Sequence, residues 1–275
     1  MERIIWMLWF QGWDKAPVLV QLCRESWQRL HPDWKIVLLD ENNLKEYVDI
    51  DPIIARNVRH ITPQARANIV RINLLRQYGG VWVDATCFCR RSLNSWLPEV
   101  MTSGFFAFRD PGPDRIMSNW FLASEKDCYL TNTLCEAVNA YWRENTFSGR
   151  LGLRKLFLGY YSKNTKRTDL WFHWMITKGL KIFPFFWFHY LFARTARNDR
   201  QFRQIWERTP YRPADPIHAV YFYKQSRMID EQMRGRLMNG DEPLYKLSWK
   251  RIPRDGIVEG SVLDFLFTHM MPEKR

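Results

Sequence analysis

The first third of the chain alternates between short apolar runs and longer segments with helical periodicity. Apolar, β-prone runs at residues 3–9 and 34–40 predict two strands. Between them, residues 17–30 repeat apolar side chains at helical spacing, and Pro17 suits a first helical position. The second strand ends on a carboxylate, Asp40.

Residues 62–80 predict a further helix with signals at both ends. Thr62 is a candidate N-terminal cap, Pro63 fits the first turn, and Gly79 fits the left-handed position that ends many helices. The segment "VWVDATCF" that follows predicts a third strand, which carries Asp84. Periodicity further along predicts two short strands and one helix, at residues 104–110, 118–124 and 130–145.

This order of strands and helices predicts an α/β protein with a largely parallel sheet covered by helices. Ligands of such sheets bind at the carboxyl ends of the strands, where Asp40 and Asp84 are expected. Asn68 and Arg71 share one face of the helix that precedes the third strand. Arg71 and Asp84 therefore either converge on a ligand such as a nucleoside diphosphate with its metal, or form a structural ion pair.

Composition narrows the class of partner. The chain has 275 residues, enough for a full core, with 46% hydrophobic and 16% aromatic residues. Its net charge of +12 indicates an anionic partner, which is nucleic acid, a phosphorylated small molecule or an acidic membrane surface. No helix-turn-helix, RNP or zinc-finger pattern occurs, so we do not expect nucleic acid.

The cysteines indicate a reducing compartment. Five cysteines, an odd number, lie in core-like segments, which predicts free thiols. Cys87 and Cys89 have no partner ligands at zinc-site spacing and are interpreted as buried thiols. The first residues lack the pattern of a signal peptide, and we expect a cytoplasmic protein.

The second half of the chain is basic and aromatic. Residues 182–193 form an apolar run of 12, too short for a membrane span, which needs about 20 residues. Its basic flanks favour contact with an anionic membrane surface, although a buried helix is the alternative. The flanking cations are Lys178, Lys181, Arg194, Arg197 and Arg200.

The segment "ARANIVRINLLRQYGGVWVDAT" (65–86) resembles the signature of the capsular polysaccharide synthesis proteins and related retaining sugar transferases with a DXD motif, such as the initiation-specific mannosyltransferases. Three weaker blocks agree with this resemblance, and together they extend it over most of the chain. They are the opening strand, loop and helix, the block "LWFHW" (170–174) and the block "PLYKLSWK" (243–250).

The resemblance implies a GT-A fold, Rossmann-like, with a mixed, mostly parallel sheet and a helical, aromatic-rich C-terminal part. It implies a bacterial enzyme that transfers a sugar from a nucleotide-sugar to a glycan or lipid-linked saccharide, with retention, in capsular or other cell-surface polysaccharide synthesis. The cytoplasmic face of the inner membrane is the implied location. Residues 1–125 are expected to bind the donor, and residues 126–275 to form an acceptor side that closes back on this core.

The resemblance also implies site residues. Asp84 is the first acid of the DXD motif, and Arg71 is expected beside it as the second catalytic residue. Thr86 stands where the second acid is expected, and it reduces the strength of the implied Mn or Mg site. The implied donor-binding residues are Trp9, Gln11, Asp40, Asn68, Arg71, Gly80 and Lys246.

Two histidines, His173 and His218, are further candidates for a metal or phosphate contact, with packed core residues as the alternative. Lys246 is either a phosphate-binding cation or a solvated surface lysine. Because Thr86 replaces an acid, a non-catalytic interaction protein with the same fold remains a rival to the enzyme.

Overall fold

The computed structural model describes residues 1–148, 167–253 and 256–273. A five-stranded sheet in the order β2-β1-β3-β6-β5 forms its centre. The strands are β1 (Ile4–Leu8), β2 (Lys35–Leu39), β3 (Gly80–Val83), β5 (Phe105–Gly112) and β6 (Arg115–Ser124). Only β6 runs antiparallel to its neighbours, so the mostly parallel α/β sheet expected from the sequence is confirmed.

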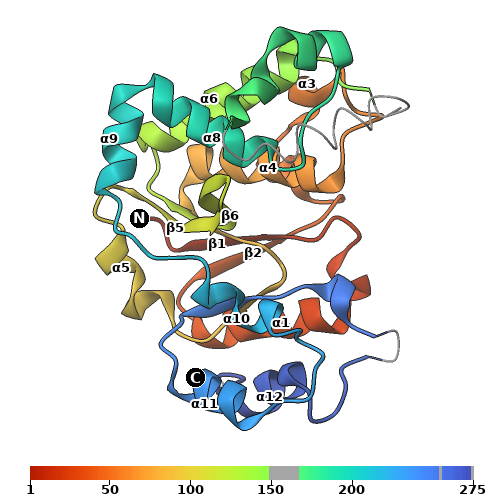
Figure 1. Cartoon of the computed structure of the whole chain (residues 1–275), viewed down its shortest axis with the longest axis vertical. Coiled ribbons are helices and arrows are strands. Elements are labelled where there is room, and N and C mark those ends of the chain that lie inside the picture. Colours follow the sequence, from red (N-terminus) through yellow and green to blue (C-terminus); the bar gives the residue numbers. More distant parts are fainter. Residues whose placement is uncertain (149–166, 254–255, 274–275) are drawn as a thin grey trace.

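Helices cover both faces of the sheet (Figure 1). One layer contains α4 (Pro63–Tyr78), α6 (Tyr129–Glu144), α8 (Trp187–Asn198) and α9 (Arg200–Arg208). On the other side lies α1 (Val18–Leu30), and α11 (Glu231–Asn239) and α12 (Val262–His269) lie beyond it, farther from the sheet. The shorter elements are η1 (Trp13–Lys15), α2 (Leu44–Tyr47), α3 (Asp51–Ile54), η2 (Leu93–Ser95), α5 (Leu97–Val100), η3 (Thr168–Phe172), η4 (Met175–Leu180), η5 (Pro216–His218), α10 (Ala219–Phe222) and η6 (Trp249–Arg251).

The two-residue period of the strands divides the core into two halves. Ile5 and Met7 of β1 pack with the layer that contains α1, whereas Trp6 packs with the layer that contains α4. Along β3, Val81 and Trp82 separate in the same way. Burial on both faces explains why these strands are continuous apolar runs in the sequence.

The predicted ends of α4 are confirmed. The Thr62 hydroxyl accepts a hydrogen bond from the backbone N–H of Ala65 at 3.2 Å, and Gly79 ends the helix with φ of 67°. At Gly80, where φ is 90°, a Cβ atom would lie 2.6 Å from the carbonyl oxygen of Ile4. The glycine pair therefore allows the close approach of β3 to β1.

The single strand predicted at "VWVDATCF" is wrong in its second half. β3 ends at Val83, and the chain turns so that the N–H of Cys87 donates to the carbonyl of Asp84 at 2.9 Å. The following strand, β4 (Cys87–Cys89), leaves the main sheet and pairs with β7 (Leu244–Lys246). This pairing is non-local, and so the local pattern of residues cannot reveal it.

The apolar run at 182–193 is largely part of the core. Trp187, Phe188 and Phe192 are buried in the same half of the core as Trp142 of α6, and Phe185 is 73% exposed. For most of this run the structure shows the buried helix that was the alternative interpretation. In the parts of the chain that the structure describes, no helix combines the length and apolarity needed to cross a membrane.

All five cysteines are free, as predicted, and Cys23, Cys87, Cys89 and Cys135 are buried.

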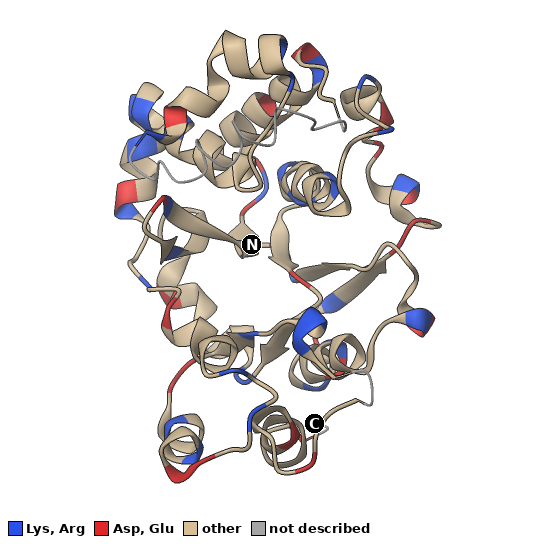
Figure 2. Ribbon diagram, turned by 45° about the vertical axis from the view of Figure 1, so that its right-hand side comes forward, with Lys and Arg blue, Asp and Glu red and all other residues tan. Residues whose placement is uncertain are grey.

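Lys and Arg residues are spread over both helical layers and the loops (Figure 2). Within the part of the chain that the structure describes, the basic residues are not gathered on one helix or one loop.

The buried His31 at the end of α1 predicts a pH-dependent stability. Its Nε2 accepts a hydrogen bond from the N–H of Leu93 at 2.8 Å, and its Nδ1 lies 2.9 Å from the carbonyl of Trp27. Burial lowers the pKa of His31 to about 4. Below about pH 6.5 the unfolded chain binds a proton that the native histidine does not, so acidification toward pH 4 destabilises the protein.

We therefore expect His31→Gln to reduce the pH dependence of the free energy of unfolding between pH 6.5 and 4. The expected reduction is at most about 1.4 kcal/mol per pH unit, the effect of one proton. Urea denaturation at a series of pH values measures it, with the exposed His60→Gln as control. Equal slopes for the two variants would contradict the assignment.

Candidate active site

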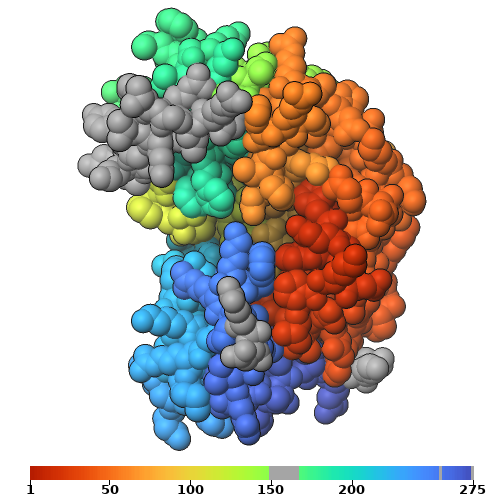
Figure 3. All heavy atoms as spheres, turned by 90° about the vertical axis from the view of Figure 1, so that its right-hand side faces the viewer, coloured from red at the N-terminus to blue at the C-terminus, as the bar shows by residue number. Residues whose placement is uncertain are grey.

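A cleft of about 590 Å³ opens where the carboxyl ends of β1 and β3 meet the C-terminal part of the chain. The face in Figure 3 is hollowed between the red N-terminal segment, the blue C-terminal segment and the helices above them. The side chains that line this cleft come from the end of β1, α4, the end of β3, the β5–β6 hairpin, α8 and the segment after β7. This is the edge of the sheet at which the sequence predicted a site.

Donors from distant parts of the chain hold the carboxylate of Asp84 at the base of the cleft. Its Oδ1 accepts a hydrogen bond from the indole N–H of Trp82 at 3.0 Å and lies 3.3 Å from Nη2 of Arg71. Its Oδ2 accepts a hydrogen bond from Nζ of Lys246 at 3.1 Å. The backbone N–H of Asp84 donates to the carbonyl of Trp120 at 2.8 Å, which fixes the turn. Both carboxylate oxygens are thus engaged.

Burial and charge act on the pKa of Asp84 in opposite directions. Burial disfavours the ionised form, but the charges of Lys246 and Arg71 outweigh it and hold the pKa of Asp84 below its usual value. For Lys246, burial likewise favours the neutral form, and the neighbouring Asp84 outweighs it, so the pKa of Lys246 is raised. Both groups are therefore ionised at neutral pH.

Arg71 reaches Asp84 from α4 as the sequence predicted. Its side chain is buried, and its Nε donates to the carbonyl of Ala67 at 3.2 Å. One terminal N–H donates to the carbonyl of Asn119, and the guanidinium lies over the ring of Trp82, 4.8 Å from its centroid. These contacts fix the guanidinium at the base of the cleft.

Thr86 and Lys246 are brought together by the β4–β7 pairing. Cys87 lies opposite Lys246 in the register, and the N–H of Leu247 donates to the carbonyl of Thr86 at 2.9 Å. Nζ of Lys246 then donates to the Thr86 hydroxyl at 2.5 Å as well as to Asp84. Lys246 is therefore a partly buried cation of the cleft and not a solvated surface lysine.

The side chains present do not by themselves make a divalent-metal site. Asp84 and Thr86 offer one carboxylate and one hydroxyl, and both are hydrogen-bonded to Lys246. Among the residues that the structure describes, no three His, Cys, Asp or Glu side chains are grouped so that they could hold a metal. Mg²⁺ and Mn²⁺ prefer about six oxygen ligands, with carboxylates supplying the charge.

The structure brings several other predicted residues to the cleft. Trp9 and Gln11 line it after β1, and the ring of Trp9 packs edge-on against Trp249 with centroids 5.8 Å apart. Asn68 lines it from α4, where its Oδ1 accepts a hydrogen bond from Asn119 at 2.8 Å. These side chains offer aromatic surface and amide groups to a ligand.

Three predicted residues lie elsewhere. Asp40 does not line the cleft, because its Oδ1 accepts hydrogen bonds from the backbone N–H groups of Asn42 and Asn43 and caps a turn. Gly80 is buried within β3, where it serves the strand packing described above. His173 follows η3, is exposed and is not a cleft residue.

Two histidines line the cleft, and the sequence predicted one of them. His218 packs edge-on against Trp120, with centroids 5.4 Å apart, and burial lowers its pKa to about 4. His189 of α8, which sequence reasoning missed, is buried with its Nδ1 unpaired, and burial lowers its pKa to about 3. Both rings are therefore neutral at pH 7. The residues around His189 in the sequence show no motif that marks it as a site residue, because the cleft is formed by segments that are distant in the sequence.

The cleft carries an excess of positive charge. The described residues that line it include four cationic side chains and one carboxylate, Asp84, while a second carboxylate, Asp114, is paired with Arg115 at 3.1 Å. The cations are Arg71, Arg115, Lys246 and Lys250. Arg115 was missed in the sequence, and its guanidinium lies over the ring of Phe186 at 3.9 Å from the centroid. Such a lining attracts an anion, and planar guanidinium groups suit phosphate in particular.

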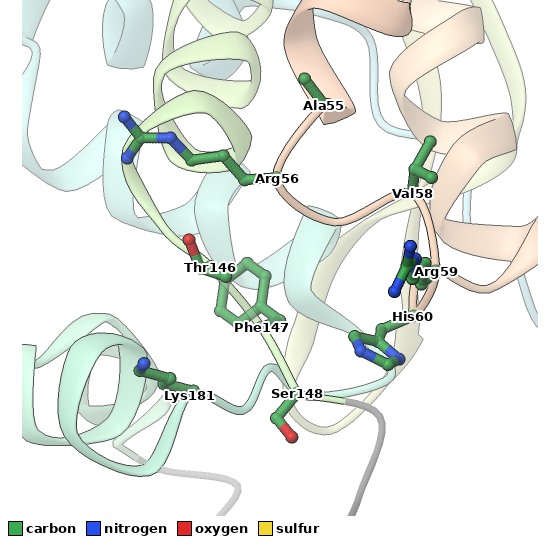
Figure 4. Close-up of a pocket in the computed structure, with 9 residues that line it drawn as sticks. All are labelled: Ala55, Arg56, Val58, Arg59, His60, Thr146, Phe147, Ser148 and Lys181. Carbon is green, nitrogen blue, oxygen red and sulfur yellow. The ribbon is translucent and has the colours of Figure 1, made fainter.

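A second cavity of about 480 Å³ is a weaker candidate for the site. Arg56, Arg59, His60 and Lys181 are among its lining residues (Figure 4). Figure 4 shows that Arg56 extends away from Arg59 and His60, so the two guanidinium groups do not converge. None of the described residues that line this cavity follows a strand of the main sheet.

The fold and the cleft define an α/β protein with a cleft rich in cationic side chains at the carboxyl ends of its strands. Residues 1–171 match the family of capsular polysaccharide synthesis proteins. This match covers more than half of the chain, and the chain belongs to that family.

Three curated relatives of this chain are named as glycosyltransferases. The chain is 32% identical over 160 residues to the O-glycosyltransferase braB of Annulohypoxylon truncatum, which covers 51% of this chain and 38% of braB. It is 29% identical over 104 residues to the glycosyltransferase afumC of Aspergillus fumigatus, covering 34% and 27% of the two chains. It is also 28% identical over 139 residues to the O-glycosyltransferase PaGT of Phomopsis amygdali, which covers 44% of this chain and 34% of PaGT.

The chain therefore spans less than two fifths of the length of these curated relatives. All three come from fungi, and they do not support the expectation of a bacterial protein. Among solved structures, the PaToxG glycosyltransferase is similar with 14% identity and a TM-score of 0.42, over 75% of each chain.

The ion pairs of Asp84 predict a large effect of Asp84→Asn on stability. The substitution keeps the shape of the side chain but leaves the charges of Arg71 and Lys246 without their carboxylate. We expect the free energy of unfolding to fall by about 3 kcal/mol, as for other broken buried pairs. The control is Asp241→Asn, which removes an exposed ion pair with Arg91 and is expected to cost less than about 1 kcal/mol. Equal losses in urea denaturation would contradict this account.

Proposed function

We propose that this chain is a glycosyltransferase that moves a sugar from a nucleotide-sugar to a hydroxyl group of a saccharide. The observation that carries the proposal is the cationic cleft at the carboxyl ends of β1 and β3, with Asp84 at its base. Family membership and the printed names of the relatives support the same activity.

The charge of the cleft suits the leaving group of such a transfer. The bond between the anomeric carbon and the phosphate oxygen breaks, and its electron pair stays on the departing nucleoside diphosphate. The acceptor oxygen forms the new bond to the anomeric carbon, and its proton passes to the released phosphate. Arg115 and Lys246 line the cleft, and in this proposal they are the cations that stabilise the added negative charge.

Unpaired polar groups in the cleft support a polyhydroxylated ligand. The indole N–H groups of Trp9 and Trp120 are buried and have no hydrogen-bond partner among the described residues, and the same is true of the ring nitrogen Nδ1 of His189. All three residues line the cleft. Buried polar groups are normally paired, so hydroxyl groups of a bound sugar are fitting partners for them. The aromatic rings also offer flat apolar surface to the C–H faces of a sugar.

The stereochemistry, the acceptor and the location of the transfer are further parts of the proposal. Inversion would call for a free carboxylate that acts as general base on the acceptor. Asp84 is the one carboxylate among the described residues of the cleft, and it is ion-paired with Arg71 and Lys246. This arrangement supports retention. The family's description supports an acceptor from cell-surface polysaccharide synthesis. Contact with a membrane stays a prediction, and the exposed Phe185 is a side chain that could make it.

The rival function is that of a non-catalytic protein that binds a nucleotide-sugar without turnover. Thr86, which stands in place of an acid, is the feature that favours it. Release of free nucleoside diphosphate from the nucleotide-sugar separates the two functions, because only the enzyme generates it.

A binding experiment tests the proposal at Arg115. Calorimetry with UDP, GDP, ADP, dTDP and CMP is expected to show binding of at least one nucleotide. Arg115→Gln is expected to weaken this binding about tenfold or more, the loss of one charge-assisted contact to phosphate. Arg56→Gln, in the second cavity, serves as the matched control and is expected to bind normally. If Arg56→Gln weakens binding and Arg115→Gln does not, or if none of these nucleotides binds, the proposal fails.

A further inference from the structure

We propose that the ammonium group of Lys246 stands where a divalent metal ion would stand in a site with two acids, so that donor binding and transfer need no metal. This inference rests on the proposed function and adds to it the means by which the leaving group is stabilised. It departs from the Mn or Mg requirement that the DXD resemblance implies.

The position of Lys246 carries the inference. Its Nζ lies 3.1 Å from Oδ2 of Asp84 and 2.5 Å from the hydroxyl of Thr86. These are the first and third residues of the Asp-Ala-Thr sequence, the two positions from which a DXD motif presents its acids. Lys246 therefore bridges the side chains that a metal ion would have to bridge.

The backbone holds Lys246 in this position. The β4–β7 pairing sets Lys246 opposite Cys87, and a hydrogen bond of 2.9 Å joins Leu247 to Thr86. The flanking Tyr245 and Leu247 are both buried in the core. The start of the lysine side chain is thus fixed by a strand and by two anchored neighbours, and its ammonium group is directed into the cleft.

A divalent ion would meet strong opposition at this point. Oδ1 of Asp84 is engaged by Trp82 and Arg71, and Oδ2 by Lys246, so an ion that bound Oδ2 would stand directly beside the ammonium group of Lys246. Two positive charges already face the single negative charge of Asp84. A further charge of +2 within a few Å of them is repelled unless more carboxylates compensate it.

The hydrogen-bond capacity of Lys246 fits the proposed role. An ammonium group has three N–H donors, and Asp84 and Thr86 take two of them. The third is available to an oxygen of the diphosphate that leaves with the electron pair of the broken anomeric bond. Replacing an acid by Thr86 is then no defect, because a second carboxylate beside Lys246 would cancel the positive charge that the phosphate requires.

The first test needs no variant. UDP, GDP, ADP, dTDP and CMP are titrated into the wild-type protein by calorimetry, once with EDTA and once with Mn²⁺. We expect that the affinity of the nucleotide that binds is the same in EDTA and in Mn²⁺ to within about twofold. We also expect that Mn²⁺ without nucleotide gives no binding signal by electron paramagnetic resonance. Release of nucleoside diphosphate from the matching nucleotide-sugar is expected to persist in EDTA.

Variants then test Lys246 itself. Lys246→Met is expected to weaken nucleotide binding in EDTA by about 10- to 100-fold, the effect of one charge-assisted hydrogen bond. Lys126→Met, an exposed lysine outside the cleft, is the matched control and is expected to bind as the wild type does. The double variant Thr86→Asp with Lys246→Ala restores an acid pair and removes the cation, and we expect it to bind Mn²⁺ and to need it for nucleotide binding.

The outcomes separate the two levels of the account. If a nucleotide binds to the wild type only with Mn²⁺, the metal-free site is overturned and the proposed function stands. If no nucleotide binds under either condition, the proposed function fails and the inference fails with it. Should Lys246→Met bind as the wild type does in EDTA, Lys246 has no role in holding the phosphate.

Discussion

The ionic contact of Asp84 with Arg71 and Lys246 is the interaction on which the site depends. It joins residues from α4, from the end of β3 and from β7, which are far apart in the sequence. The carboxylate compensates two partly or fully buried cations, and without it each would be expensive to bury. At the same time, one carboxylate against two cations leaves the base of the cleft positive. One cluster therefore both connects the C-terminal part of the chain to the sheet and attracts a ligand of opposite charge.

Two local features put this cluster in place. Gly80 lets β3 approach β1 so closely that no larger side chain fits, and the strand ends at the carboxyl edge of the sheet. The turn after Asp84 then sends the chain to β4, which leaves the main sheet and pairs with β7. This pairing brings Lys246 to Thr86, so the C-terminal strand completes a site that begins in the first third of the chain.

The sequence predicts well what depends on local pattern. The strands, the ends of α4 and the positions of Asp84 and Arg71 follow from apolar periodicity, helix caps and strand ends. It fails where distant segments decide the outcome. The break after Val83 depends on pairing with β7, and the burial of Trp187 and Phe188 depends on helices and a sheet that the local sequence does not reveal. Arg115 and His189 belong to the cleft only because the β5–β6 hairpin and α8 meet there, whereas Asp40 is used by its own turn.

A crystal structure with a bound nucleoside diphosphate, grown in the presence of Mn²⁺, tests the central claim most directly. The account predicts that the diphosphate lies in the Asp84 cleft, with a phosphate oxygen within hydrogen-bond distance of Nζ of Lys246, and that Lys246 still contacts Asp84 and Thr86. A manganese ion between Asp84 and Thr86 with Lys246 displaced would contradict the metal-free site. A nucleotide bound in the second cavity, beside Arg59 and His60, would contradict the assignment of the active site itself.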